Sequence, residues 1–216
     1  MKIKTALCFS TPIYDLEEPS FLKDLNKITS KYIEESKKNS KKDLEERENF
    51  LNKKIGDHGF SFNSTSLIAD KKLEKFKSYI GKTCVSILDS QGYDLSNHLL
   101  FFKELWVQEF AKNGGGHHDT HIHFNSHLSG FYFLQCSDKT SYPLFFDPRP
   151  AKNMIQLPVK KDKELNLATE IINYKIKPGS LIIFPSYLPH QFVIDHGVDP
   201  FRFIHFNLQA ISKDVL

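Results

Sequence analysis

The sequence predicts a mainly β fold with helices in its N-terminal part. Two observations favour this class: apolar residues recur at helical spacing in the first half of the chain, and beyond Leu99 they form short or alternating runs between turn-forming residues. The chain has 216 residues, 40% hydrophobic and 13% aromatic, with 19 phenylalanines. This length suits one domain with a full core and is too short for two ordinary enzyme domains, so we expect a single domain over residues 1–216.

Helical periodicity dominates residues 19–54, where we expect one or two helices. The apolar positions that recur every three or four residues are Leu22, Leu25, Ile28 and Tyr32. Mixed charges over residues 31–54 are typical of a solvated helical face rather than of a binding patch. A further helix is predicted over residues 70–90, although Gly81 inside it lowers helix propensity by about 1 kcal/mol. We expect this helical part, residues 1–98, to pack on the β core.

Seven apolar or alternating runs in the second half predict strands. They are Leu99–Ala111, Gly130–Cys136, Tyr142–Phe146, Glu170–Ile176, Ser180–Phe184, Gln191–Ile194 and Phe201–Leu208. Glycine- and proline-containing breakers such as Asn113–Gly116 and Asp147–Pro150 separate them. Because no repeat or linker interrupts residues 99–210, the simplest architecture is a jelly-roll with helices packed on it.

The composition limits the classes of partner and compartment. A net charge of +3, from 29 basic and 26 acidic residues, gives no indication of nucleic-acid binding. No run approaches the roughly 18 apolar residues of a membrane span, and Pro12 interrupts any signal-like start. Cys8, Cys84 and Cys136 are an odd number without CxxC spacing, which is typical of reduced thiols. We therefore expect a cytoplasmic protein with no membrane partner; homo-oligomerisation stays open.

Three histidines form the most informative pattern. His121 and His123 are two positions apart, so a β-strand would direct both side chains to one face. His190 follows a turn and a strongly apolar strand, from which a third imidazole can reach the same interior. Neutral imidazoles on one face of a metal leave its opposite positions open for substrates. The sequence therefore predicts a metal site formed by His121, His123 and His190.

Arg202 opens the last predicted strand, twelve residues after His190. Its planar guanidinium can hold a carboxylate by two charge-assisted hydrogen bonds. Alternation would place Ile204 and Phe206 on the same face as Arg202, where they would form an apolar wall around the bound acid. We therefore expect Arg202 to bind a carboxylate near the metal.

The ordered set of these pieces resembles the iron(II)- and 2-oxoglutarate-dependent oxygenases, in particular a branch found in bacteria and in cyanobacterial phages. The stretches that carry the resemblance are His121–Leu134, Phe146–Arg149, Lys177–Pro185, His190 and Arg202, within roughly residues 101–208. The resemblance implies a cupin-like double-stranded β-helix that uses Fe(II), 2-oxoglutarate and O2. It implies a dioxygenase, by default a hydroxylase, which couples substrate oxidation to decarboxylation of 2-oxoglutarate to succinate. The sequence does not determine which small molecule or peptidyl residue is the substrate.

The chain departs from the family pattern at one ligand, because the usual triad is two histidines and a carboxylate in a His-x-Asp arrangement. Two assignments stay open: a three-histidine centre of His121, His123 and His190, or His117 and Asp119 together with His190. Asp119 could also join the first set from its loop. The three-histidine centre is favoured because the strand after it lies at the family-like distance, whereas the alternative pair follows three glycines.

Five further residues carry weaker expectations. Asn125, Ser126 and Tyr132 lie close in sequence to the ligands, and we expect them to hydrogen-bond the co-substrate or the ligands, although core or turn roles fit as well. Arg149 resembles a recurring family element that faces substrate, with turn packing as the simpler interpretation. Trp106 is more typical of a core residue.

Two other functions stay open at this point. A cupin-like three-histidine metalloenzyme that does not use 2-oxoglutarate would bind its substrate through Arg202. A non-catalytic jelly-roll binding module would use the histidines only structurally. Neither accounts for the whole ordered set.

Overall fold

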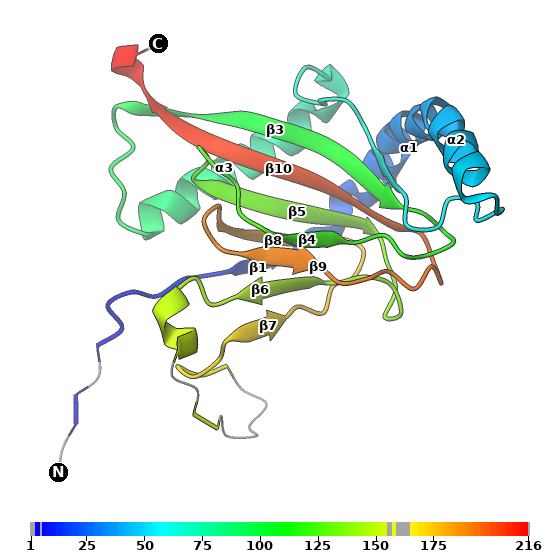
Figure 1. Cartoon of the computed structure of the whole chain (residues 1–216). Helices are drawn as coiled ribbons and strands as arrows, with labels where there is room; N and C mark the ends of the chain where they lie inside the picture. The colour runs from blue at the N-terminus through cyan, green and yellow to red at the C-terminus, as the bar shows by residue number, and fades with distance from the viewer. Residues whose placement is uncertain (1–2, 5, 155–156, 159–164, 216) are drawn as a thin grey trace.

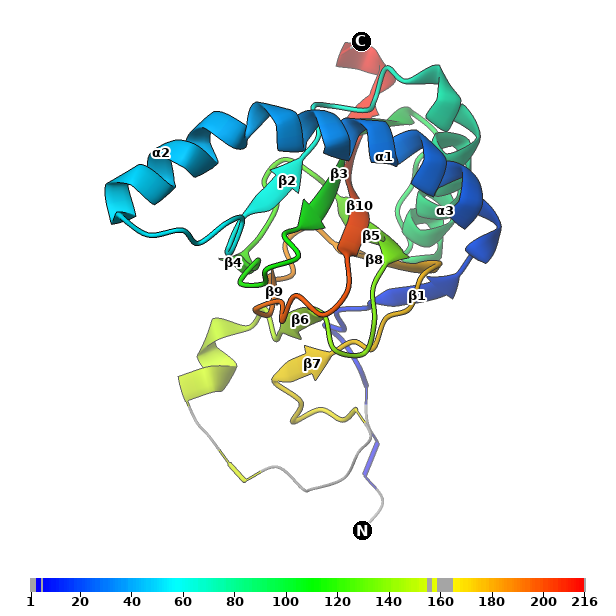
Figure 2. The same cartoon turned by 90° about the vertical axis from the view of Figure 1, so that its right-hand side faces the viewer.

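Two antiparallel sheets packed face to face form the body of the protein in this computed structural model, which describes residues 3–4, 6–154, 157–158 and 165–215. The larger sheet has six strands in the order β1-β8-β5-β10-β3-β2, and the smaller has four in the order β4-β9-β6-β7 (Figure 1). The helices lie on the side of the larger sheet that faces away from the smaller one (Figure 2). This arrangement is a jelly-roll, and it confirms the predicted mainly β class with N-terminal helices.

The strands of the larger sheet are β1 (Tyr14–Glu17), β2 (Ser61–Asn63), β3 (His98–Phe110), β5 (Leu128–Gln135), β8 (Ser180–Pro185) and β10 (Phe201–Ser212). Those of the smaller sheet are β4 (His118–His121), β6 (Pro143–Phe146), β7 (Ile171–Asn173) and β9 (His190–Phe192). All seven predicted strands are present. Strands β1, β2 and β4 were not predicted, because their three or four residues each are too few to show a clear period.

The N-terminal part is not only helical, because β1 pairs with β8 and β2 pairs with β3 at the two edges of the larger sheet. Its helices are α1 (Leu22–Asn39), α2 (Lys41–Leu51) and α3 (Glu74–Ser90), with short 3-10 turns at Pro19–Phe21 and Lys71–Leu73. Two more 3-10 turns span Pro150–Met154 and Lys213–Val215. The helices predicted over residues 19–54 and 70–90 are thus confirmed.

Strand alternation in the larger sheet separates two cores. Helices α1 and α3 bury residues such as Leu25 and Phe76 against the outer face, whereas α2 buries none and is solvated, as its charges predict. The core between the sheets is dominated by phenylalanines: Phe110, Phe131, Phe133, Phe145, Phe184, Phe192, Phe201 and Phe203. His190 and His205 are buried beside this aromatic core, each in ring contact with Phe131.

The cysteines and the helices bear on two expectations from composition. Cys8, Cys84 and Cys136 are all free. In the part of the chain that the structure describes, none of the helices combines the length and the apolar character that crossing a bilayer requires. That residues 1–216 form a single domain stays a prediction.

Candidate metal centre

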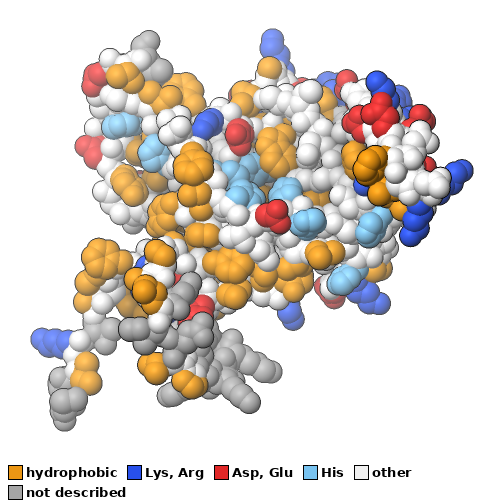
Figure 3. All heavy atoms as spheres, in the orientation of Figure 1, with side chains coloured by type: hydrophobic (Ala, Val, Ile, Leu, Met, Phe, Trp, Pro, Cys, Tyr) orange, Lys and Arg blue, Asp and Glu red, His pale blue; other side chains and the backbone are white. Residues whose placement is uncertain are grey.

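The two sheets bring His121, His123 and His190 together. Strand β4 pairs with β9 so that His121 lies directly opposite His190. His123 follows the end of β4, and its backbone N–H donates to the carbonyl oxygen of Ser186 at 2.9 Å. One ring nitrogen from each histidine lies within 4.8 Å of the other two. Histidine side chains gather near the middle of the face seen in Figure 3, among apolar ones.

Backbone carbonyl groups set the tautomers of two of these histidines. The Nδ1 atom of His121 lies 2.7 Å from the carbonyl oxygen of Asp119, and Nδ1 of His190 lies 2.9 Å from that of Leu188. A carbonyl oxygen only accepts, so each Nδ1 carries the hydrogen and each Nε2 keeps a free lone pair. The Nε2 atom of His190 is buried and has no hydrogen-bond partner in the part of the chain that the structure describes. A metal ion would satisfy this orphaned acceptor, so the residues present fit a metal.

Burial also keeps the site in the protonation state that a metal needs. Desolvation, together with smaller contributions from neighbouring imidazoles, lowers the pKa of His123 to about 4 and that of His190 to about 3. Metal binding requires the neutral imidazole, because a protonated ring nitrogen has no lone pair to donate. Three imidazoles without a carboxylate suit a divalent transition metal such as iron, zinc or nickel.

The alternative assignment is not assembled in the structure. The side chain of Asp119 is 98% exposed, and its carboxylate lies 3.8 Å from Nε2 of His117, which is itself half exposed. The cluster with His190 contains neither of them. Asp119 contributes only its backbone oxygen, which orients His121. The exposed β4 edge turns these residues outward, so the structure contradicts the hypothesis that they join His190.

Two further histidines border the triad and were missed by sequence analysis. His205 is 1% exposed, and its Nε2 lies 3.2 Å from Nε2 of His123. Its ring packs on Trp106 with centroids 4.6 Å apart. His118 lies beside the triad on β4, with its Nε2 2.7 Å from Nε2 of Gln108. His205 is two positions after Phe203 and four after Phe201, so strand alternation places all three on one face. This spacing is the signal that could have indicated His205.

Arg202 does not reach the histidines, and the expectation that it faces them is wrong. Its guanidinium donates to Glu109 from Nη2 at 2.6 Å and from Nε at 2.7 Å, and to Oγ of Ser30 on α1 at 2.9 Å. Lys37 of α1 also pairs with Glu109. Arg202 therefore belongs to a buried ion cluster between the larger sheet and α1.

Strand alternation is the reason for this placement. Phe201 and Phe203 occupy the inner face of β10, so Arg202 between them must point to the outer face. Ile204 and Phe206 likewise pack in the helix-side core rather than around a co-substrate. The apolar wall that the sequence predicts around Arg202 thus exists, but on the other side of the sheet.

Tyr132 also lies on the helix side, which contradicts its expected role at the site. Its hydroxyl donates to the carbonyl oxygen of Glu18 at 2.7 Å, its ring contacts Phe76, and burial raises its pKa. Asn125 and Ser126 follow His123 in the chain, Asn125 within the turn at residues 124–125, and their expected roles stay predictions. Asn125 adopts φ = 54°, a left-handed conformation that asparagine tolerates. The Oγ atom of Ser126 is buried and has no hydrogen-bond partner among the described residues.

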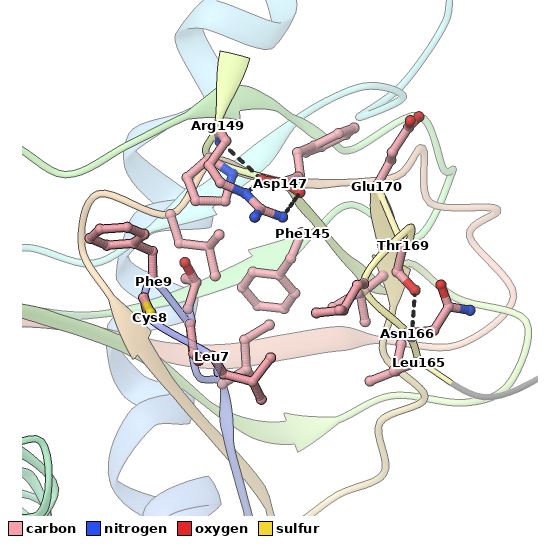
Figure 4. Close-up of a pocket in the computed structure, with 18 of the residues that line it drawn as sticks. Leu7, Cys8, Phe9, Phe145, Asp147, Arg149, Leu165, Asn166, Thr169 and Glu170 are labelled. Carbon is pink, nitrogen blue, oxygen red and sulfur yellow. Dashed lines mark hydrogen bonds and ion pairs between the residues drawn. The ribbon is translucent and has the colours of Figure 1, made fainter. Parts of the chain in front are cut away.

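A cavity of about 540 Å³ lies next to the smaller sheet, between the N-terminal segment, β6 and the loop before β7 (Figure 4). Arg149 stands at its edge, where its guanidinium donates to both carboxylate oxygens of Asp147. Phe145 lines the cavity and also contacts the ring of His190, with centroids 6.0 Å apart. The cavity is thus close to the centre but separated from it by an aromatic side chain.

Comparison with known proteins defines the class of this fold and site. AviO1 from Streptomyces viridochromogenes superposes with a TM-score of 0.56 at 9% identity, over 92% of this chain and 90% of that one. A prolyl-4-hydroxylase of Pseudomonas putida gives 0.53 at 8% identity, over 93% and 94%. HygX from Streptomyces hygroscopicus, solved with nickel and 2-oxoglutarate, gives 0.54 at 8% identity, over 92% and 83%. At such low identity these likenesses show the fold alone, a double-stranded β-helix.

The family follows from the sequence itself. Residues 104–207 match the model of the family described as "Putative 2OG-Fe(II) oxygenase". No curated protein sequence is significantly similar to this chain. Residues 104–207 therefore form a region that belongs to the 2OG-Fe(II) oxygenases, as the resemblance of its motifs predicts, and this family is one of oxidoreductases.

Proposed function

We propose that this protein is an Fe(II)- and 2-oxoglutarate-dependent dioxygenase that holds iron through His121, His123 and His190. The observation that carries the proposal is the convergence of three imidazole nitrogens within 4.8 Å, one of them buried and without a partner. Iron in such a site supplies the activation of O2 by which this class oxidises C–H bonds, with hydroxylation as the default outcome.

The chain's own residues contribute orientation and exclusion of water. The carbonyl groups of Asp119 and Leu188 hold two imidazoles with Nε2 toward the centre. Phenylalanines such as Phe131 and Phe184 contact His190 and keep solvent from its inner side. Because the set has no carboxylate, we expect weaker retention of iron and more positive charge on it than in a two-histidine, one-carboxylate centre.

The cavity beside the smaller sheet indicates the size of the substrate. The cavity beside Phe145 is of a size that accepts a small molecule or a single residue of a peptide. One solved likeness is a prolyl hydroxylase of Trichoplax adhaerens in complex with a peptide fragment, which supports the same range. Ser126, whose buried hydroxyl has no partner among the described residues, is our candidate for a hydrogen bond to the co-substrate.

The three free cysteines support a cytoplasmic location, because reduced thiols are typical of that compartment.

The test is anaerobic titration of the metal-free protein with Fe(II) and then with 2-oxoglutarate. A visible charge-transfer band of the chelated keto acid is the expected signal. His190→Ala should abolish it, whereas His98→Ala, which removes an exposed histidine at the start of β3, should leave it unchanged. Equal iron content in wild type and His190→Ala would refute the metal assignment.

A three-histidine metalloenzyme that does not use 2-oxoglutarate is the second candidate. The observation that favours it is the outward position of Arg202, which removes the expected carboxylate site from the interior. In that case iron would bind without a charge-transfer band, and aerobic incubation with 2-oxoglutarate would release no succinate.

A further inference from the structure

The outward position of Arg202 leaves the distal carboxylate of 2-oxoglutarate without its expected partner. Arg202 is the only lysine or arginine among the buried charged residues of the described chain, and Glu109 already neutralises it. The core between the sheets offers phenylalanine instead. Burying a carboxylate without a partner costs several kcal/mol of binding free energy. The co-substrate therefore needs a cation elsewhere on the histidine side.

We propose that Lys103 of β3 binds this distal carboxylate at the edge of the histidine centre. The inference rests on the proposed function, because it concerns the co-substrate of that same site. Three features of the structure support it: a β-bulge, a contact with the segment that carries His123, and an ammonium group that pairs with no carboxylate of the described residues.

The bulge turns Lys103 toward the histidine side. In the pairing of β10 with β3, Asn207 lies opposite Glu104 and Leu208 opposite Phe102, so Lys103 has no partner. Phe102 and Leu105 both pack in the helix-side core although they are three residues apart. The two residues between them therefore both lie away from that core. Bulges are common next to active sites because they redirect a side chain in this way.

A backbone contact places the ammonium group beside the segment that follows His123. Nζ of Lys103 donates to the carbonyl oxygen of Phe124 at 2.7 Å, and Phe124 directly follows His123. The contact also restrains an otherwise exposed side chain, which reduces the entropy that binding an anion would cost.

The ammonium group of Lys103 has donors available for an anion. It has three N–H donors, and the Phe124 carbonyl takes one. Lys103 forms no ion pair with a carboxylate of the residues that the structure describes. Its neighbour Glu104 accepts instead from Nδ2 of Asn207, whose Oδ1 accepts from Ser129. Two donors and a full positive charge thus remain for a ligand carboxylate.

The experiment compares two keto acids on the iron-loaded protein under anaerobic conditions. 2-Oxoglutarate has the distal carboxylate and 2-oxopentanoate lacks it, while both chelate iron through the keto-acid end. In Lys103→Met, the charge-transfer titration should show an affinity for 2-oxoglutarate that is about 10- to 100-fold weaker, the range of a charge-assisted hydrogen bond. The affinity for 2-oxopentanoate should stay at the wild-type value, and Lys103→Arg should retain most of the affinity for 2-oxoglutarate.

Lys213→Met is the matched control, because Lys213 also donates from Nζ to a backbone carbonyl, that of Ser96, at the far end of β10. It should bind both acids as wild type does, and unchanged iron affinity in Lys103→Met shows that the site is folded. Equal 2-oxoglutarate affinity in wild type and Lys103→Met overturns this inference alone. Wild type that binds iron but neither keto acid overturns the proposed function, and this inference with it.

Discussion

Replacing Arg202 with methionine separates a structural role from a co-substrate role. In the structure Arg202 donates two hydrogen bonds to Glu109 at 2.6 and 2.7 Å, and the side chains of the pair are 9% and 3% exposed. Methionine keeps much of the side-chain volume but leaves the Glu109 carboxylate with Lys37 as its remaining cation. Removing one partner of a buried pair lowers the free energy of unfolding by about 3–5 kcal/mol. Because Lys37 still pairs with Glu109, we expect a loss at the lower end of this range, about 3 kcal/mol.

Urea unfolding of the metal-free protein measures this loss as a lower midpoint at unchanged slope. The double variant Arg202→Met/Glu109→Met should recover at least about 2 kcal/mol, because an apolar pair can replace a buried ion pair at little cost. The affinity of iron-loaded Arg202→Met for 2-oxoglutarate should equal that of wild type. Unchanged stability together with lost 2-oxoglutarate binding would refute the reasoning and place Arg202 at the co-substrate.

Three further predictions concern the centre and the sheet beneath it. Burial lowers the pKa of His190 to about 3, below its unfolded value near 6.5, so its stabilising effect is complete above about pH 6.5 and is lost as the pH falls toward 3. Between pH 7 and 4.5 the metal-free protein should lose about 2–3 kcal/mol from this group, and His190→Ala should flatten the urea-measured profile by that amount. His205→Phe should weaken iron binding about 10- to 100-fold in a competitive chelator titration, because Nε2 of His205 contacts His123; an unaltered affinity would remove His205 from the centre. Gly130→Ala would place Cβ 2.3 Å from the ring of Phe206, so we expect a loss of about 1–3 kcal/mol in thermal or urea unfolding, and a neutral effect would show that the two strands separate easily.

Local patterns determined the elements and the candidate metal ligands. The period of apolar residues is a property of neighbouring positions, so residues 19–54 and 70–90 predict helices and the seven runs after residue 98 predict strands, without knowledge of their partners. The two-residue spacing of His121 and His123 places both on one side of an extended segment, and a turn before His190 allows it to join them. A strand such as β4 was missed because four polar residues show no period.

The tertiary structure alone decided which side of a strand each polar residue faces. Alternation in sequence divides β10 into two sets but does not say which set faces the histidines, and the burial of Phe201 and Phe203 between the sheets assigned Arg202 to the opposite side. The same assignment turned His205 inward. Lys103 depends on a bulge, which arises from the pairing of two strands about a hundred residues apart and has no signature in either strand by itself. Helical and strand periods are encoded locally, whereas the side that a residue faces is set by long-range pairing and by competition for the buried space.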